Sequence, residues 1–211
     1  FQILYRKLNM EKHKIVSKQN LLPFILVTAL FYLWAIPNNL NDILIPQFMK
    51  SFELNRLQAG LVQSAFYMGY FLLALPAAYI MDRFNYKTGI ITGLLLFATG
   101  SFLFYPAATS GKYEMFLLAL FVIASGLSFM ETGANSFIAV LGDPATSAQR
   151  LNFSQAFNPL GAMSGVFICN VFIFSGVEHS EAQVEVLKAS GQYQSYLQSE
   201  ILRVIPPYMI Y

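Results

Sequence analysis

The stretch LLPFILVTALFYLWAIPNNLND, residues 21–42, decides the fold class of this chain. Most of it is apolar or aromatic, and no charged side chain occurs before its last residue. A run of about 20 such residues is long enough to cross the hydrocarbon core of a bilayer. The stretch nevertheless ends in three asparagines and an aspartate. It therefore predicts a membrane helix whose final turns face a polar environment.

The composition of the whole chain also favours a membrane protein. Only 11% of the 211 residues are charged and 56% are hydrophobic, whereas soluble domains carry about 25% charged residues. A soluble all-α protein would need polar faces on its helices, and the second, third and fifth apolar spans have almost no charge with which to build them. The net charge of +2 is too small to indicate nucleic-acid binding.

Short charged segments divide the chain into long apolar spans. We expect an all-α integral membrane bundle, with a basic cytoplasmic tail (1–20), five transmembrane helices (21–177), an extracytoplasmic loop (178–203) and the start of a sixth helix (204–211), where the bundle is truncated. The five spans cover residues 21–46, 57–81, 88–111, 115–142 and 151–177. Lys and Arg are more frequent in the segments that lie inside when the N-terminus is cytoplasmic, which favours that orientation.

Two acidic residues, Asp42 and Glu131, fall inside expected spans. An ionisable group in a membrane span is costly and normally faces a bundle interior or a wet cavity. Neither residue has a Lys or Arg within its own span. A carboxyl group removed from water without a cation is protonated more readily, as a proton-coupled carrier requires. For Asp42, a position at the water interface near the end of its helix is the alternative.

Uncharged polar side chains recur at helical spacing on four of the expected spans. Residues three or four positions apart share a helix face. The sets are Asn38 with Asp42, Gln63 with Tyr67 and Tyr70, Glu131 with Asn135, and Asn152 with Gln155 and Asn158. Such stripes can join helices by hydrogen bonds, but four of them with two acids favour the lining of a polar cavity.

The residue types in these stripes indicate the class of ligand. Amides and carboxylates hydrogen-bond hydroxyl groups, and the aromatic faces of Trp34, Phe66 and Tyr67 suit the C–H face of a sugar ring. A polyol-like substrate is therefore expected. No P-loop, paired metal ligands, nucleophile elbow or Rossmann fingerprint occurs, so we expect neither an enzyme nor a cofactor or metal site.

Other features predict packing. The GxxxG sequence GAMSG, residues 161–165, is typical of closely packed membrane helices. Pro37, Pro76 and Pro159 are expected to kink their spans. The single cysteine, Cys169, lies in an apolar run and reads as a core residue.

Five stretches resemble the fucose permease branch of the major facilitator superfamily. They are FYLWAIPNNLNDILIPQF (31–48), AGLVQSAFYMGYF (59–71), YKTGIITGLLLFATG (86–100), ETGANSFIAVLG (131–142) and RLNFSQAFNPLGA (150–162). The resemblance runs from about residue 22 to 175. It corresponds to the N-terminal half of a twelve-helix transporter, whose C-terminal half would supply the other wall of the site.

The resemblance implies proton-coupled sugar uptake by alternating access across the bacterial inner membrane, driven by the proton gradient without a cofactor. The acids of the family's NNLND and E-T-x-A-N motifs, which matter for proton coupling, correspond to Asp42 and Glu131. The family's first-helix asparagines correspond to Asn38, Asn39 and Asn41, and the aromatic residue beside them to Trp34. The amides that line its sugar site correspond to Gln155 and Asn158.

Some positions depart from the family pattern and leave the sugar open. Ser136 stands where a proline is usual, Pro159 where a small polar residue is common, and DRFNYK (82–87) lacks the glycine of the superfamily signature. L-fucose or a related monosaccharide is expected, with glucose, galactose or N-acetylglucosamine as alternatives. A membrane sugar sensor, a non-transporting fragment and an exporter of amphipathic compounds are the other hypotheses.

Overall fold

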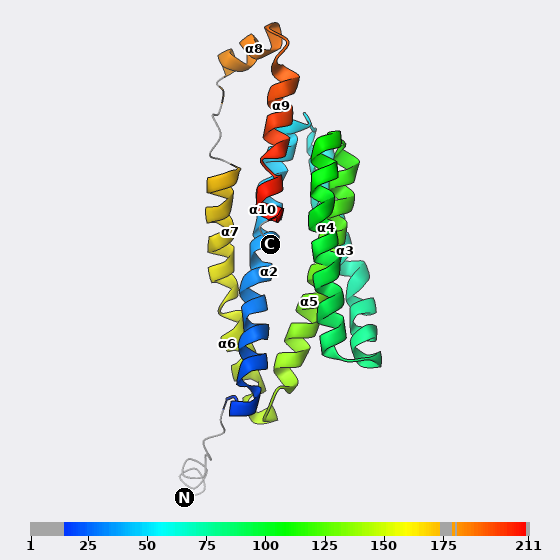
Figure 1. The fold of residues 1–211 in the computed structure, drawn as a ribbon, viewed down its shortest axis with the longest axis vertical. Coiled ribbons are helices and arrows are strands. Elements are labelled where there is room, and N and C mark those ends of the chain that lie inside the picture. The colour runs from blue at the N-terminus through cyan, green and yellow to red at the C-terminus, as the bar shows by residue number, and fades with distance from the viewer. Residues whose placement is uncertain (1–14, 174–178, 180, 210–211) are drawn as a thin grey trace, which may run out of the picture.

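The computed structural model describes residues 15–173, 179 and 181–209, and within them every regular element is a helix (Figure 1). Short 3₁₀ turns, η1 (Lys18–Asn20) and η2 (Pro144–Thr146), precede α2 and α6. The α-helices are α2 (Leu21–Ser51), α3 (Arg56–Arg83), α4 (Tyr86–Ser110), α5 (Tyr113–Val140), α6 (Ser147–Gln155), α7 (Asn158–Phe172), α8 (Glu181–Ala189), α9 (Tyr193–Leu202) and α10 (Ile205–Met209).

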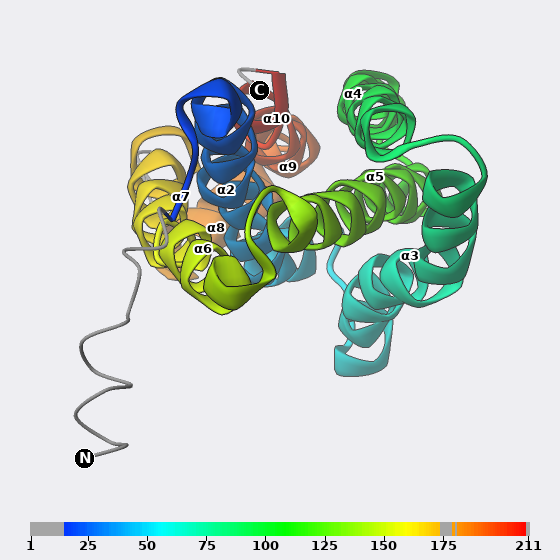
Figure 2. The ribbon, with the colours of Figure 1, turned by 90° about the horizontal axis from the view of Figure 1, so that it is seen from below.

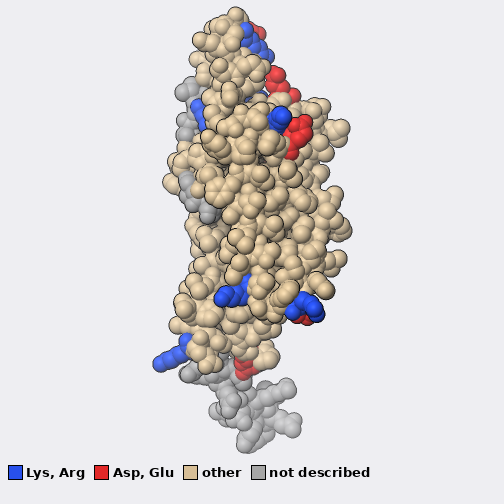
Figure 3. Space-filling view, turned by 45° about the vertical axis from the view of Figure 1, so that its right-hand side comes forward, with Lys and Arg blue, Asp and Glu red and all other residues tan. Residues whose placement is uncertain are grey.

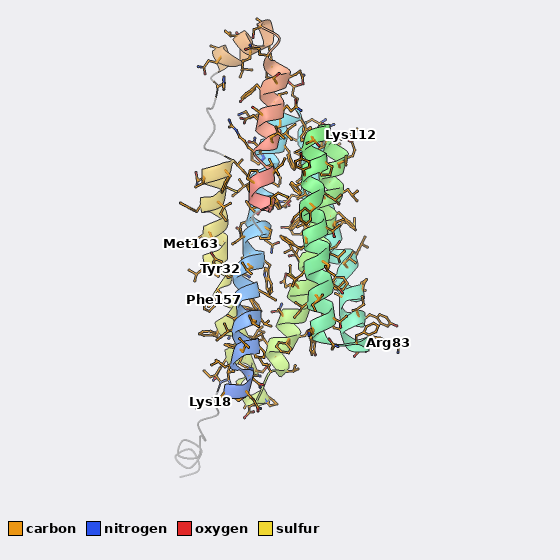
Figure 4. All side chains as sticks on the ribbon, in the orientation of Figure 1. Lys18, Tyr32, Arg83, Lys112, Phe157 and Met163 are labelled. Atoms are coloured by element: carbon orange, nitrogen blue, oxygen red, sulfur yellow. The ribbon has the colours of Figure 1, made fainter. Side chains whose placement is uncertain are left out.

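Helices α2 to α5 match the first four expected spans. In the described part of the chain, these four are long and apolar enough to cross a membrane. On the face shown in Figure 3, charged side chains gather toward the two ends of the molecule and leave an uncharged band between them. Lys18 and Arg83 lie toward one end and Lys112 lies at the other (Figure 4). This distribution fits a bundle whose middle lies in lipid.

The expected fifth span, residues 151–177, is not one continuous helix. Helix α6 ends at Gln155 and α7 begins at Asn158, with Pro159 in its first turn. Proline has no N–H to donate to the carbonyl four residues earlier, so the hydrogen-bond ladder of α6 stops there. The three polar residues that were expected to share one face, Asn152, Gln155 and Asn158, are therefore divided between two helices. Residues 174–177 lie outside the described part.

The segment expected to be a polar loop contains α8 and α9, and α9 packs against the end of α2. The apolar residues Leu197 and Ile201, one turn apart on α9, are both buried. The Glu200 side chain is only 3% exposed, and it pairs with Lys50 at 2.9 Å and with Arg203 at 2.8 Å. Its position in a polar stretch had suggested a loop residue, whereas these partners allow the carboxylate to be buried.

Helix α5 lies at the centre of the bundle. Seen from below, α3 and α4 flank it on one side, and α2, α6 and α7 lie on the other (Figure 2). At the crossing of α4 with α5, a Cβ atom on Gly126 would approach the backbone nitrogen of Phe97 to 2.5 Å. Small residues thus let these two backbones meet closely, as is typical of membrane helices.

The GAMSG sequence makes the same kind of contact between α7 and α2, as predicted. A Cβ atom on Gly161 would collide with the carbonyl oxygen of Tyr32 and would come within 2.8 Å of the Ala35 side chain. Tyr32 also joins the two helices, since its hydroxyl lies 2.8 Å from the hydroxyl of Ser164. Figure 4 shows Tyr32 and Met163 on these neighbouring helices.

Arg150 closes the end of α5 from inside the protein. Its side chain is completely buried, and it donates to the carbonyl oxygens of Ile138 (3.1 Å) and Ala139 (2.9 Å) in the last turn of α5. Those carbonyls have no partner within the helix, and a cation at this end also complements the helix dipole. Arg150 donates further to the Thr146 hydroxyl (2.7 Å) and the Ile15 carbonyl (3.4 Å).

Gly161→Ala is expected to destabilise the protein by about 1–3 kcal/mol, because an added methyl group overpacks the seam between α7 and α2. The matched control is Gly60→Ala on α3, where a Cβ atom meets nothing within 4 Å. That control should be neutral or stabilising, since alanine is the better helix former. Thermal unfolding of both variants in detergent checks this, and equal stabilities would contradict the close packing.

Arg150→Lys is expected to cost about 3 kcal/mol or more, because the completely buried side chain loses several hydrogen bonds from a charged donor, worth about 1.5–3 kcal/mol each. An ammonium group cannot replace the forked donors of a guanidinium. Arg56→Lys, at an exposed site, is the control and should shift stability by less than about 0.5 kcal/mol. Unfolding midpoints measured side by side test the difference; an unchanged Arg150→Lys protein would refute this role.

Candidate functional site

The polar sequence NNLND lies in the middle of α2, between two prolines. Pro37 and Pro46 are both inside the helix, and each removes a backbone hydrogen bond, Pro46 from the carbonyl of Asp42. Helix α2 continues to Ser51. Asp42 therefore lies well before the end of its helix and does not cap it.

A chain of amide hydrogen bonds links α2 to α3. The buried Asn41 donates from Nδ2 to Oε1 of Gln63 at 2.9 Å, and Gln63 in turn donates from Nε2 to Oδ1 of Asp42 at 2.8 Å. A carboxylate that accepts from a neutral amide is oriented without being neutralised by a cation. Gln63 therefore fixes the direction of the Asp42 carboxylate.

A second link joins α2, α3 and α5 through Tyr70. Its hydroxyl donates to Oδ1 of Asn38 at 3.1 Å and also interacts with the carboxyl group of Glu131. The backbone carbonyl of Tyr70 accepts from the Ser128 hydroxyl at 3.1 Å, which holds α3 against α5. Tyr70 thus connects the polar segment of α2 to the acidic residue of α5.

These side chains surround a cavity of about 390 Å³, within the range of about 300–1,000 Å³ that is usual for small-molecule sites. The cavity combines aromatic rings, amides and two carboxyl groups. Its lining residues are Asn38, Asn39, Asp42, Phe66, Tyr67, Tyr70 and Glu131. Asn39 also donates to the carbonyl of Ala35 at 2.7 Å, so one of its amide hydrogens is held by its own helix.

The charges around this cavity are acidic. Among the described residues that line it, Asp42 and Glu131 are ionisable acids and none is a Lys or Arg. An anionic ligand would meet repulsion, whereas hydroxyl groups would find both donors and acceptors. The exposed ring of Tyr67 and the buried ring of Phe66 pack edge to face, with centroids 5.8 Å apart, and give the cavity an apolar surface.

The predicted site residues divide into three groups. Asn38, Asn39, Asp42, Tyr67 and Glu131 line the cavity directly. Asn41 and Gln63 are attached to that wall through the Asp42 hydrogen bonds. The remaining predicted residues, Trp34, Asn135, Gln155 and Asn158, are not among those that line it.

Trp34 differs most from the expectation. Its side chain is 3% exposed and packs on Phe31, with ring centroids 4.3 Å apart. It belongs to the hydrophobic core of the bundle, although it lies one turn from Asn38 on α2. Sequence spacing places the two residues on one face and does not show that packing against Phe31 buries the Trp34 ring.

A second polar contact lies further along α5. Gln155, the last residue of α6, donates from Nε2 to Oδ1 of Asn135 at 3.5 Å. Asn135 is one turn from Glu131, so this pair extends the polar face of α5 beyond the cavity. Asn158 is half-buried in the first turn of α7.

Phe66 and Tyr70 also line the cavity; the sequence had indicated Phe66 as an aromatic face for a sugar and Tyr70 as part of a polar stripe, without assigning either to the binding residues. A signal for Tyr70 was present, because it continues the polar and aromatic stripe of Gln63 and Tyr67 at helical spacing. Glu200 had no comparable signal. Its burial depends on Gln47 and Lys50, which are far from it in sequence.

Comparison with known families gives a match to the model described as Major Facilitator Superfamily over residues 23–177. The chain is 47% identical to an L-fucose-proton symporter of Escherichia coli (strain K12), and the match covers 92% of this chain and 44% of that protein. It is 42% identical to a glucose/galactose transporter of Brucella abortus biovar 1 (strain 9-941), with coverages of 75% and 39%. The chain thus spans less than half the length of these curated relatives.

Among solved structures, the chain is similar to the crystal structure of FucP, a Major Facilitator Superfamily transporter, in the outward conformation. The TM-score is 0.78 at 47% sequence identity, and the match covers 92% of this chain and 47% of that one. The two proteins therefore share many side chains as well as the path of the backbone. The resemblance found in the sequence motifs is confirmed.

The amide chain can be tested with a double-mutant cycle at Asn41 and Gln63. Gln63→Leu leaves the buried Asn41 amide without its acceptor and is expected to cost about 1–3 kcal/mol. The double variant Asn41→Leu/Gln63→Leu removes both partners and should cost less than the sum of the single changes. Ser64→Ala, at an exposed neighbouring position on α3, is the control. Strict additivity in thermal unfolding would contradict the coupling.

Proposed function

Because the chain belongs to the major facilitator superfamily, we propose that it forms the N-terminal six-helix half of a proton-coupled sugar symporter. The observation that carries this proposal is the single cavity into which α2 brings Asp42 and α5 brings Glu131, beside the amide of Asn38 and the ring of Tyr67. Acidic groups serve proton exchange there, and amides and rings serve a sugar. The relatives described as L-fucose-proton symporters support the same assignment.

The transport cycle proceeds by alternating access, with two halves of the transporter moving about a site near the middle of the membrane. This chain supplies one wall of the site. The opposite wall comes from the C-terminal half, which corresponds to the part of the relatives that this chain does not match. The protein lies in the bacterial inner membrane with its N-terminus in the cytoplasm, and the polar segment after α7 faces the outside.

In this proposal Asp42 and Glu131 are the proton-coupling groups. When a carboxylate takes up a proton it gains an O–H donor and loses its charge. At Glu131 this changes what the Tyr70 hydroxyl meets and alters its bond to Asn38. The protonation state of α5 is thereby transmitted to the sugar-binding face of α2. Gln63 plays the corresponding positioning role for Asp42.

Asn38, Asn39 and Tyr67 make the direct contacts with the sugar. Asn41 and Gln63 position this wall from behind. Asn135, Gln155 and Asn158 lie where the polar face of α5 continues beyond the cavity. There they contact either the sugar or the C-terminal half of the transporter. For Trp34 we propose an indirect role, since its buried ring supports the turn of α2 that carries Asn38.

The substrate is a monosaccharide, with L-fucose first among the candidates. Glucose and galactose form a second possibility that a specific finding favours, because the Brucella relative described as a glucose/galactose transporter is 42% identical. Competition by unlabelled glucose and galactose against labelled L-fucose uptake separates the two. Related transporters can have a similar cavity and still carry different sugars when amides provide most of the contacts, since an amide can hydrogen-bond any well-placed hydroxyl.

Asp42→Asn and Glu131→Gln are each expected to reduce gradient-driven accumulation of radiolabelled L-fucose in proteoliposomes by tenfold or more. A tenfold lower concentration ratio corresponds to about 1.4 kcal/mol less free energy stored in the sugar gradient. A protonophore should abolish accumulation by the unmodified full-length protein. Glu114→Gln, an exposed acid in the first turn of α5, is the matched control and should transport normally. Normal accumulation in both cavity variants would refute the coupling roles, and indifference to the protonophore would refute proton coupling itself.

A further inference from the structure

A second polar cavity lies where the end of α2 meets the end of α4 and one face of α9. It measures about 380 Å³ and shares no lining residue with the first cavity. In Figure 1 these three helix ends come together toward the end of the bundle opposite the described N-terminal residues. The lining residues are Ser51, Phe52, Glu53, Thr109, Ser110, Gly111, Gln194, Leu197, Gln198 and Ile201.

The Ser51 hydroxyl is an unused hydrogen-bonding group in this wall. The residue is 4% exposed, and its Oγ atom is buried without a partner in the described structure. A buried hydroxyl without a partner is costly, so such groups are rare and call for an explanation. A ligand hydroxyl in the cavity would supply the partner.

Glu53 provides a second sign of a functional surface. Its φ angle is +51°, a left-handed conformation that is strained for a non-glycine residue and that is often found at ligand sites. The carboxylate accepts a hydrogen bond from the hydroxyl of Tyr193 at 3.1 Å. The strained backbone thus keeps an acidic acceptor beside the cavity.

Helix α9 supplies amides on a firmly attached wall. Gln194 and Gln198 lie one turn apart and both line the cavity, while Leu197 and Ile201 form its buried apolar side. The attachment is the buried Glu200, which pairs with Lys50 on α2 at 2.9 Å. The glutamines are therefore held in place for a ligand instead of moving with a free loop.

We propose that this cavity is a second binding site, for a neutral, hydroxyl-rich small molecule such as a free monosaccharide. Its volume lies in the usual range for small-molecule sites. Hydroxyls and amides provide donors and acceptors, and the ring of Phe52 provides an apolar face. Glu53 is the one charged group among the described residues that line it, which disfavours an anion. The site rests on its own lining and does not depend on the transport proposal.

The test measures protection of a cysteine at this site in the full-length protein. Cys169 is buried and is replaced by Ala, and Gln198→Cys then introduces one exposed thiol. L-fucose and D-galactose, added at about ten times the dissociation constant, should slow its reaction with a polar maleimide about tenfold. Ser195→Cys, exposed on the same helix but outside the lining, should react at an unchanged rate. Gln194→Cys repeats the measurement if Gln198→Cys folds poorly.

Further variants separate this site from the central one. Protection should persist with Asn38→Leu, which removes a hydrogen-bonding amide from the central cavity, and should weaken with Ser51→Ala, which removes the unpartnered hydroxyl. Loss of protection with Asn38→Leu would show that sugar acts from the central cavity and would overturn the proposal, as would absence of protection in both cysteine variants. Protection by phosphatidylglycerol nanodiscs without sugar, compared with phosphatidylcholine, would assign the cavity to a lipid headgroup and would also overturn it.

Discussion

The structure depends on one constraint, that a polar group inside a membrane bundle needs a partner from the protein. Water is not available there to satisfy it, so unpaired groups are costly. The chain meets much of this requirement through the bonds from the Asn41 amide nitrogen to Gln63 and from Gln63 to Asp42, while the Asn41 Oδ1 atom has no partner in the described structure. Tyr70 adds bonds to Asn38 of α2 and to Ser128 of α5. These bonds do two things at once. They hold α2, α3 and α5 together. They also orient Asn38, Asp42 and Tyr70 so that these side chains line one cavity.

The same constraint explains the two buried charges at the ends of the bundle. Arg150 donates hydrogen bonds to the last carbonyls of α5 and to the Thr146 hydroxyl. Glu200 is paired with both Lys50 and Arg203. Both tie a largely polar chain segment to the apolar bundle. Glycine contacts such as Gly161 against Tyr32 then bring the spans close enough for these polar bonds to form. The cavities lie between tightly joined regions, which gives them defined walls.

Much of the fold followed from the sequence because the spacing of charges and the length of apolar runs report directly on membrane spans. The stretches around α2 to α5 were placed within a few residues, and GAMSG was correctly interpreted as a packing motif. Residues 151–177 were expected to form one span with a kink at Pro159, and in the described residues this span is divided into α6 and α7 at that proline. The segment 178–203 was read by polarity alone, and polarity does not show that Leu197 and Ile201 can bury one face of α9.

By itself the sequence determined the class of protein, the family and most residues of the candidate site, because these depend on composition, local spacing and motif order. Asp42 and Glu131 stood out since an acid in an apolar run is rare at any depth. Only the tertiary structure decided which polar residues meet. It brought Asp42, Tyr70 and Glu131 around one cavity, withdrew Trp34 into the core and placed Ser51 beside α9. The physical reason is that a side chain's direction is set by helix rotation and crossing, and these arise from contacts between residues far apart in the chain.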